Sequence, residues 1–176
     1  MLSLDGEIVA HGRNRVYDEG GGDDPLQRTP LAHAEMNAPA SVSEEVDLAG
    51  AELWTTQQPC SMCRAAIEFT EVGAVRYLAT DPSAEEASEG FVSSGDSDEI
   101  WIVVANGLFM HNIAWVSGED NPMLDRNHRR EPQIVGLARD LVAERTLVTP
   151  AEAGSSLERA LSQAWDQISD AFAERG

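Results

Sequence analysis

The chain has 176 residues, and its 12 basic and 31 acidic side chains give a formal net charge of −19 at pH 7. This length predicts one domain, since domains run from about 50 to 250 residues. A field of this sign repels nucleic acid and anionic membranes, so the composition opposes both as partners and favours a small neutral or cationic substrate. The densest positive cluster, Arg126, Arg129 and Arg130, is too short for a nucleic-acid footprint and is expected on a solvated loop.

The N-terminal segment, residues 2–13, predicts a β-hairpin. Asp5-Gly6 stands between two short apolar runs, which is a strong signal for a hairpin turn. No apolar core of a signal peptide is present, and no stretch approaches the length of about 18 uninterrupted apolar residues that a membrane span needs. We therefore expect neither secretion nor membrane insertion.

A helix is predicted after the glycine-rich loop that follows the hairpin. Thr29-Pro30 has the order of an N-cap residue followed by proline at the first helical position. This start would place His33 and Glu35 in the opening turns. Pro39 lacks a backbone donor and should kink the helix or end it early, so the segment that follows is expected to be partly irregular.

A strand, a second helix and a further strand come next. Glu52 to Thr56 predicts a strand, and Gln58-Pro59-Cys60 predicts the start of a helix that presents Cys60 and Cys63 on one face. Ala74 to Ala79 predicts the second strand. A strand, a helix and a strand at this spacing imply a parallel crossover.

Three side chains in these elements, His33, Cys60 and Cys63, have the nitrogen and thiolate donors that zinc takes in tetrahedral geometry. Three protein ligands leave the fourth position open, which indicates catalysis, because zinc lowers the pKa of a bound water to about 7. Glu35 is not required as a ligand and can carry the proton of that water to a leaving amine. Together these roles describe hydrolytic deamination.

Other interpretations of the Cys60–Cys63 pair remain open. Two cysteines at this spacing could form a redox pair or half of a structural zinc knuckle. A structural site needs a fourth protein ligand, and the chain has only two cysteines. The remaining histidines have no ligand-like spacing to the other three residues; they are His11, His111 and His128.

The order His33-Ala34-Glu35, then Pro59-Cys60-Ser61-Met62-Cys63, resembles the signature of the zinc-dependent cytidine and nucleobase deaminase superfamily. The His-Ala-Glu form is more similar to the branch of guanine deaminase and tRNA adenosine deaminase than to classical cytidine deaminases. The resemblance runs from about Gly6 to Asp81. It implies an α/β chain with a three-layer α/β/α fold and a mixed sheet of about five strands. One Zn²⁺ per chain is expected from the ligand set, and a homodimer is expected as well.

The resemblance also implies substrate contacts at Asn14 and Ala34. Gln58 stands where many relatives have glutamate, which could alter the polarity beside the metal. Family members generally open with a helix and a longer first strand. We therefore expect either that the start is truncated or that the C-terminal section covers that face of the sheet.

Beyond Asp81 the signature fades, and the remaining elements are predicted from local pattern. Residues 81–98 predict a linker with one short helix from Ser83. Three helices are expected after it: Ile100 to Trp115 capped by Ser97-Asp98, Gln133 to Arg145, and a last helix begun by Ser155 or Ser156. The last helix carries an apolar stripe for packing or a dimer face; its residues are Leu157, Leu161, Ala164, Trp165, Ile168 and Phe172. We expect residues 1–98 to form the zinc deaminase core and residues 99–176 a helical extension packed on it as one domain.

The sequence therefore predicts zinc-dependent hydrolytic deamination of an aminated nucleobase, nucleoside or related small heterocycle, with release of ammonia. One alternative is a catalytically idle zinc-binding fold that serves as an interaction module. Another is a nucleic-acid-editing deaminase, which the net charge opposes. Because thiolate ligands persist in a reducing compartment, the cytoplasm is the expected location.

Overall fold

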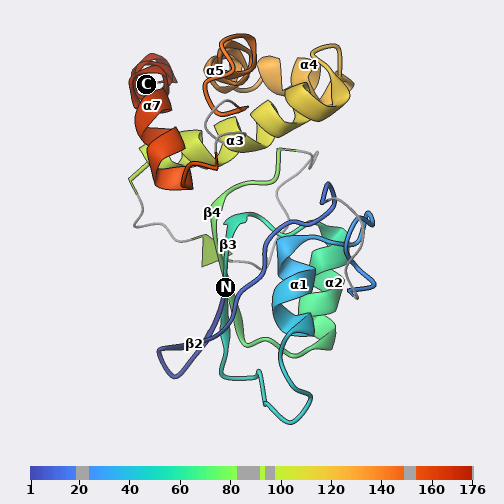
Figure 1. The fold of residues 1–176 in the computed structure, drawn as a ribbon. Helices are drawn as coiled ribbons and strands as arrows, with labels where there is room; N and C mark the ends of the chain where they lie inside the picture. The colour runs from blue at the N-terminus through green and yellow to red at the C-terminus, as the bar shows by residue number, and fades with distance from the viewer. Residues whose placement is uncertain (19–23, 83–91, 94–97, 149–153, 176) are drawn as a thin grey trace. The chain divides into compact units, whose positions relative to one another are not determined.

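The computed structural model describes residues 1–18, 24–82, 92–93, 98–148 and 154–175. The chain divides into two compact units, Met1–Gly95 and Asp96–Gly176 (Figure 1). In the residues that the structure describes, the first unit contains a mixed sheet and two helices, and the second contains helices joined by turns and loops, without a strand. Whether residues 99–176 pack on the deaminase core as one domain stays a prediction.

The first unit has a five-stranded sheet in the order β2-β1-β3-β4-β5. The strands are β1 (Leu2–Leu4), β2 (Glu7–Ala10), β3 (Glu52–Gln57), β4 (Ala74–Ala79) and β5 (Val92–Ser93). β1 pairs antiparallel with both β2 and β3, whereas β3, β4 and β5 are parallel. The predicted mixed sheet and parallel crossover are confirmed. The two-residue β5 was not predicted, and the expected helix from Ser83 lies outside the described residues.

The predicted hairpin is confirmed at Asp5 and Gly6, which join β1 to β2. Both have positive φ, 52° and 82°. Positive φ at both central residues is typical of the type I′ turn, whose twist matches that of the flanking strands. The turn therefore sets the register that brings Leu4 opposite Glu7.

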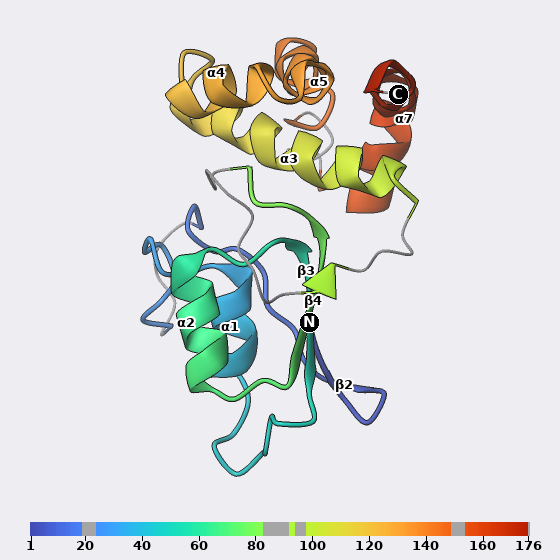
Figure 2. The ribbon, with the colours of Figure 1, turned by 180° about the vertical axis from the view of Figure 1, so that it is seen from behind.

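Two helices, α1 (Ala34–Ala40) and α2 (Ser61–Phe69), contact each other and lie on the same face of the sheet in both views (Figures 1 and 2). The core between helices and sheet consists of buried apolar side chains; it includes Leu2, Ala38, Leu53, Ile67 and Val75. Each buried leucine, isoleucine or valine contributes about 1.5–3 kcal/mol to folding. This arrangement confirms the predicted α/β class with a mixed sheet, and a helical layer on the other face of the sheet stays a prediction.

The predicted helix start at Thr29-Pro30 is wrong, because α1 begins at Ala34 with His33 as its N-cap. The Thr29 hydroxyl donates to the Leu26 carbonyl and accepts from the Leu31 amide, so it closes a turn in the loop. Such local side-chain bonds compete with helix formation. The expectation for Pro39 is confirmed, since α1 ends at Ala40.

The helices described in the second unit are α3 (Ile100–Ser117), α4 (Pro122–His128), α5 (Pro132–Ala143) and α7 (Leu157–Arg175). Helix α3 contacts the other three. Their shared core is apolar; it includes Val103, Met110, Leu124, Ile134, Val135, Leu141, Ala164 and Ile168. The three predicted helices are confirmed, although the residue that caps α3 is Glu99 rather than Ser97 or Asp98.

Helix α4 was missed, and the expectation of a solvated loop is wrong for Arg126, which lies within it. The Asn121 side chain accepts from the Met123 amide at 2.9 Å, and Pro122 occupies the first helical position. Asparagine followed by proline is the usual pattern of a helix start, so the signal was present in the sequence.

Most of the apolar stripe of α7 packs against α5 and α3 of its own unit. Ala160, Ala164 and Ile168 are buried, whereas Leu157 and Trp165 stay 63% and 37% exposed. The predicted start is confirmed, because the Ser156 hydroxyl accepts from the Arg159 amide.

Helix α3 is long and apolar enough to cross a membrane by length and composition, with a mean hydropathy of 1.4, and no such segment was expected from the sequence. A helix that is apolar on all sides is also what the interior of a helical unit requires. The contacts of α3 with α4, α5 and α7 are those of a helix in the interior of a helical unit.

Candidate zinc site

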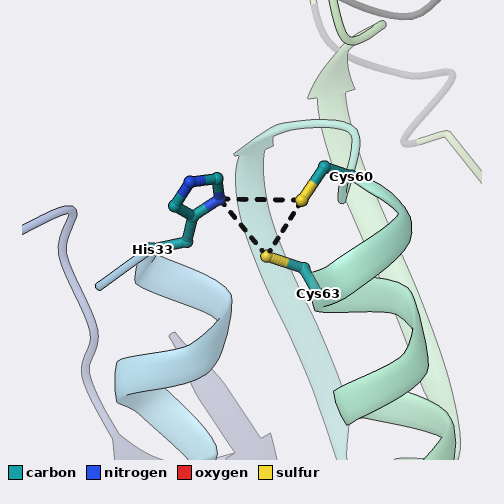
Figure 3. A group of neighbouring side chains, drawn as sticks. All are labelled: His33, Cys60 and Cys63. Carbon is teal, nitrogen blue, oxygen red and sulfur yellow. Dashed lines mark hydrogen bonds between the residues drawn. The ribbon is translucent and has the colours of Figure 1, made fainter. Parts of the chain in front are cut away.

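The candidate site lies where α1 and α2 begin (Figure 3). His33 is the N-cap of α1, Cys60 is the N-cap of α2, and Cys63 lies in the first turn of α2. The sequence of β3 followed by Gln58-Pro59 leads the chain directly into Cys60. The structure therefore brings together all three predicted ligand residues.

The three side chains face one another at distances that fit zinc. His33 Nδ1 lies 3.5 Å from Cys63 Sγ and 3.7 Å from Cys60 Sγ, and the two sulfur atoms are 3.5 Å apart (Figure 3). Tetrahedral zinc, with bonds of about 2.3 Å to sulfur and about 2.0–2.1 Å to nitrogen, requires separations of about 3.5–3.8 Å between these donors. One zinc ion therefore fits among the donors without rearrangement.

The protein groups also concentrate negative charge at this point. Hydrogen bonds with Cys63 and His33 lower the pKa of Cys60 to about 3. The hydrogen bond with Cys60, burial and the Glu35 charge raise the pKa of Cys63. The opposite directions mean that the two thiols do not ionise independently. Zinc binding requires both sulfurs as thiolates and releases their protons.

Glu35 lies in the first turn of α1 with 8% of its surface exposed. Its Oε1 accepts a hydrogen bond from the Thr55 hydroxyl, and its Oε2 lies 3.6 Å from Cys63 Sγ. The carboxylate does not belong to the three-residue group, although it contacts one member. A buried carboxylate beside an open metal position is suited to proton transfer.

Asn14 and Ala34 lie on segments that run together. Asn14 is exposed, and its Oδ1 accepts from the Val16 amide at 3.0 Å. Gly12 permits the close approach to α1, because a Cβ there would lie 2.2 Å from the Ala34 carbonyl oxygen. The geometry holds the Asn14 segment beside the start of α1, and substrate contact by either residue stays a prediction.

Two residues that hold the site were not predicted, Thr55 and Asn37. The side-chain amide of Asn37 donates hydrogen bonds to the backbone carbonyls of Arg13 and Ala32, at 2.8 and 3.3 Å. These bonds connect the Asn14 loop to the segment before His33. The face of the strand on which Thr55 lies could have been predicted from strand alternation, because residues two apart share a face and Leu53 is in the core. Nothing in the local sequence identifies the partner of Asn37.

Comparisons with known proteins agree with this site. Residues 1–79 match the family model of the cytidine and deoxycytidylate deaminase zinc-binding region. The chain is 33% identical over 90 residues to a tRNA-specific adenosine deaminase of Agrobacterium fabrum, covering 51% of this chain and 56% of the relative. It is 35% identical over 90 residues to a guanine deaminase of Bacillus subtilis, covering 49% and 53%. A tRNA-specific adenosine deaminase of Bacillus subtilis is 30% identical over 121 residues, covering 67% and 64%.

The fold and the donor set thus define a zinc-binding protein of the deaminase type. Residues 1–79 match the zinc-binding region of the cytidine and nucleobase deaminase superfamily, and zinc is the metal that their donor set fits. The matched part of the chain spans between about half and two thirds of the length of these relatives. No solved structure gives a significant match.

We expect purified protein to hold about one zinc ion per chain, because the three donors form a single site. The variant His33→Ala should lose most of this zinc, whereas His11→Ala, which changes an exposed histidine, should keep it. Elemental analysis measures both. A wild-type zinc content well below half an equivalent, with no gain on adding zinc, would contradict this expectation.

Proposed function

We propose that the protein catalyses zinc-dependent hydrolytic deamination of an aminated nucleobase, nucleoside or related small heterocycle. The observation that carries this proposal is the three-donor group His33, Cys60 and Cys63 with the non-ligand carboxylate of Glu35 against it. A fully protein-ligated structural site would need a fourth ligand. A three-donor site keeps a position for water, which is the co-substrate of hydrolysis.

Each residue has a defined role in this proposal. His33, Cys60 and Cys63 hold zinc, which when bound lowers the pKa of a coordinated water and supplies a nucleophile near neutral pH. Glu35 takes a proton from the attacking water and returns it to the departing amino nitrogen. The ring carbon gains a bond to oxygen and loses its bond to nitrogen, so an aminated ring and water give a carbonyl and ammonia. Asn14 and Ala34 contact the substrate ring.

Two observations bear on the substrate class. The names of the relatives include a deaminase of a free base, guanine, and deaminases specific for tRNA. The formal charge of −19 disfavours a polyanion, because binding a polyphosphate chain relies on neutralising cations. A small uncharged ring is therefore the favoured substrate, with tRNA editing as the second candidate. A homodimer and a cytoplasmic location stay predictions.

The proposed function is tested by ammonia release from a panel of aminated bases and nucleosides, assayed with zinc-loaded protein. Guanine, adenine, cytosine and their nucleosides form the core of the panel. We expect turnover on at least one member and none after the zinc is removed by a chelator. Ammonia release that is unchanged without zinc would overturn the mechanism. No turnover on the whole panel would favour the interaction module.

We expect no stable complex with tRNA or single-stranded DNA at about 0.15 M salt, where exposed charges still act over about 8 Å. The reason is the excess of 31 acidic over 12 basic side chains. Gel retardation with micromolar protein measures this, and a tRNA-specific adenosine deaminase provides the positive control. Tight binding together with deamination of the polymer would instead establish the second candidate.

A further inference from the structure

The two oxygen atoms of the Glu35 carboxylate have different surroundings. Oε1 accepts a hydrogen bond from the hydroxyl of Thr55, which lies on β3, twenty positions further along the chain. Oε2 lies on the side of Cys63, 3.6 Å from its sulfur. The carboxylate is therefore held at one oxygen and directed towards the metal donors with the other.

The support for Glu35 comes from a rigid part of the unit. Thr55 lies inside β3, which is hydrogen-bonded to β1 on one side and to β4 on the other. A β-branched side chain such as threonine has restricted χ1, so its hydroxyl has a fixed direction. Helix α1 alone gives weaker support, because it has only seven residues and its N-cap side chain forms no capping hydrogen bond.

We propose that Thr55 is the positioning residue of Glu35. Its hydroxyl holds Oε1, so that Oε2 is the atom that takes the proton from water and later returns it to the leaving nitrogen. A glutamate side chain has several rotatable bonds and loses substantial freedom when it is ordered. A hydrogen bond from a fixed donor to a charged acceptor is strong enough to select one orientation. This proposal rests on the proposed function, because it assigns the proton to Glu35.

The neighbouring residue gives a matched control. Thr56 is exposed and lies on the opposite face of the same strand, because successive side chains of a strand alternate between faces. Thr55→Val removes the hydroxyl at nearly constant volume, Thr55→Ser keeps a hydroxyl, and Thr56→Val makes the first change on the other face. Any general effect of valine on β3 should appear in both valine variants.

The experiment compares these three variants with the wild type by zinc content, melting temperature, kcat and KM. A second readout needs no substrate: the visible absorption spectrum of the Co(II)-substituted protein at one fixed pH, which responds to groups around the metal. We expect Thr55→Val to lower kcat by about 10- to 100-fold, the range for losing one hydrogen bond to a charged group. Its KM and zinc content should be unchanged, and its cobalt spectrum should differ from that of the wild type. Thr55→Ser should recover most of kcat, and Thr56→Val should match the wild type throughout.

With an active wild type, two outcomes would overturn the positioning role. One is a wild-type kcat together with a wild-type cobalt spectrum in Thr55→Val. Another is a fall in kcat that follows equal losses of zinc and melting temperature, which would make Thr55 merely structural. If the wild type deaminates nothing on the panel, the proposed function fails separately. The cobalt spectrum then decides the role of Thr55 alone: an unchanged spectrum overturns it, and a changed one supports it.

Discussion

Replacing Glu35 by glutamine is expected to lower kcat by roughly 10²–10⁴-fold, which is the usual contribution of general acid–base catalysis. Glutamine has nearly the same size, and its amide oxygen can still accept from the Thr55 hydroxyl, so the packing of the buried side chain is retained. The amide cannot take up or return a proton. Because Glu35 is outside the three-donor group, the zinc content should remain that of the wild type.

A control for this variant is Glu52→Gln, which removes a carboxylate from the same unit at a distance from the chemistry. Glu52 Oε1 pairs with Arg76 at 2.9 Å, and both side chains are 37% exposed. A surface pair of this kind contributes about 0–1 kcal/mol to stability, so the variant should fold and turn over normally. The measurement is kcat on the best substrate together with zinc content. Glu35→Gln with undiminished turnover would exclude Glu35 as the proton carrier.

The ligand set could be predicted from sequence because part of it is local. Cys60 and Cys63 lie within the first turn of one helix, where residues three apart meet on one face. His33 comes from a different helix, and its donor chemistry together with the resemblance to the deaminase signature joined it to the cysteines. The hairpin at Asp5-Gly6 and the parallel crossover between β3 and β4 followed from local pattern, whereas the mixed sheet that contains them was implied by the resemblance.

The supporting residues could not be predicted, because their partners are distant in sequence. The bond between Thr55 and Glu35 joins a strand to a helix across 20 positions, and it forms only after both elements pack on the core. The start of α1 was misplaced for a related reason. The Thr29 hydroxyl could form hydrogen bonds either within a turn or as a helix cap. In the structure it forms the hydrogen bonds of a turn in the loop before His33.

Exchanging Cys63 for serine is expected to remove both the zinc and the stability that zinc provides. Cys63 is fully buried in the first turn of α2, and its sulfur lies 3.5 Å from both His33 Nδ1 and Cys60 Sγ. A ligand that binds only the folded state stabilises it by RT ln(1 + [L]/Kd), which is about 4 kcal/mol at a thousandfold excess over Kd. The melting temperature of the wild type should therefore rise when zinc is added to chelator-treated protein, and that of Cys63→Ser should not.

The control for this experiment is Ile67→Ala, which changes a residue of the same helix and leaves all three zinc donors in place. Ile67 is 2% exposed and packs in the core between the helices and the sheet, so its truncation should lower the free energy of unfolding by about 2–5 kcal/mol. This variant should have a lower melting temperature than the wild type without zinc, and its melting temperature should still rise when zinc is added. Calorimetry with and without zinc separates the two effects. Cys63 is not a ligand if Cys63→Ser binds one equivalent of zinc and its melting temperature rises as much as that of the wild type. The remaining two donors would then be too few for the three-ligand site on which zinc-dependent hydrolysis depends.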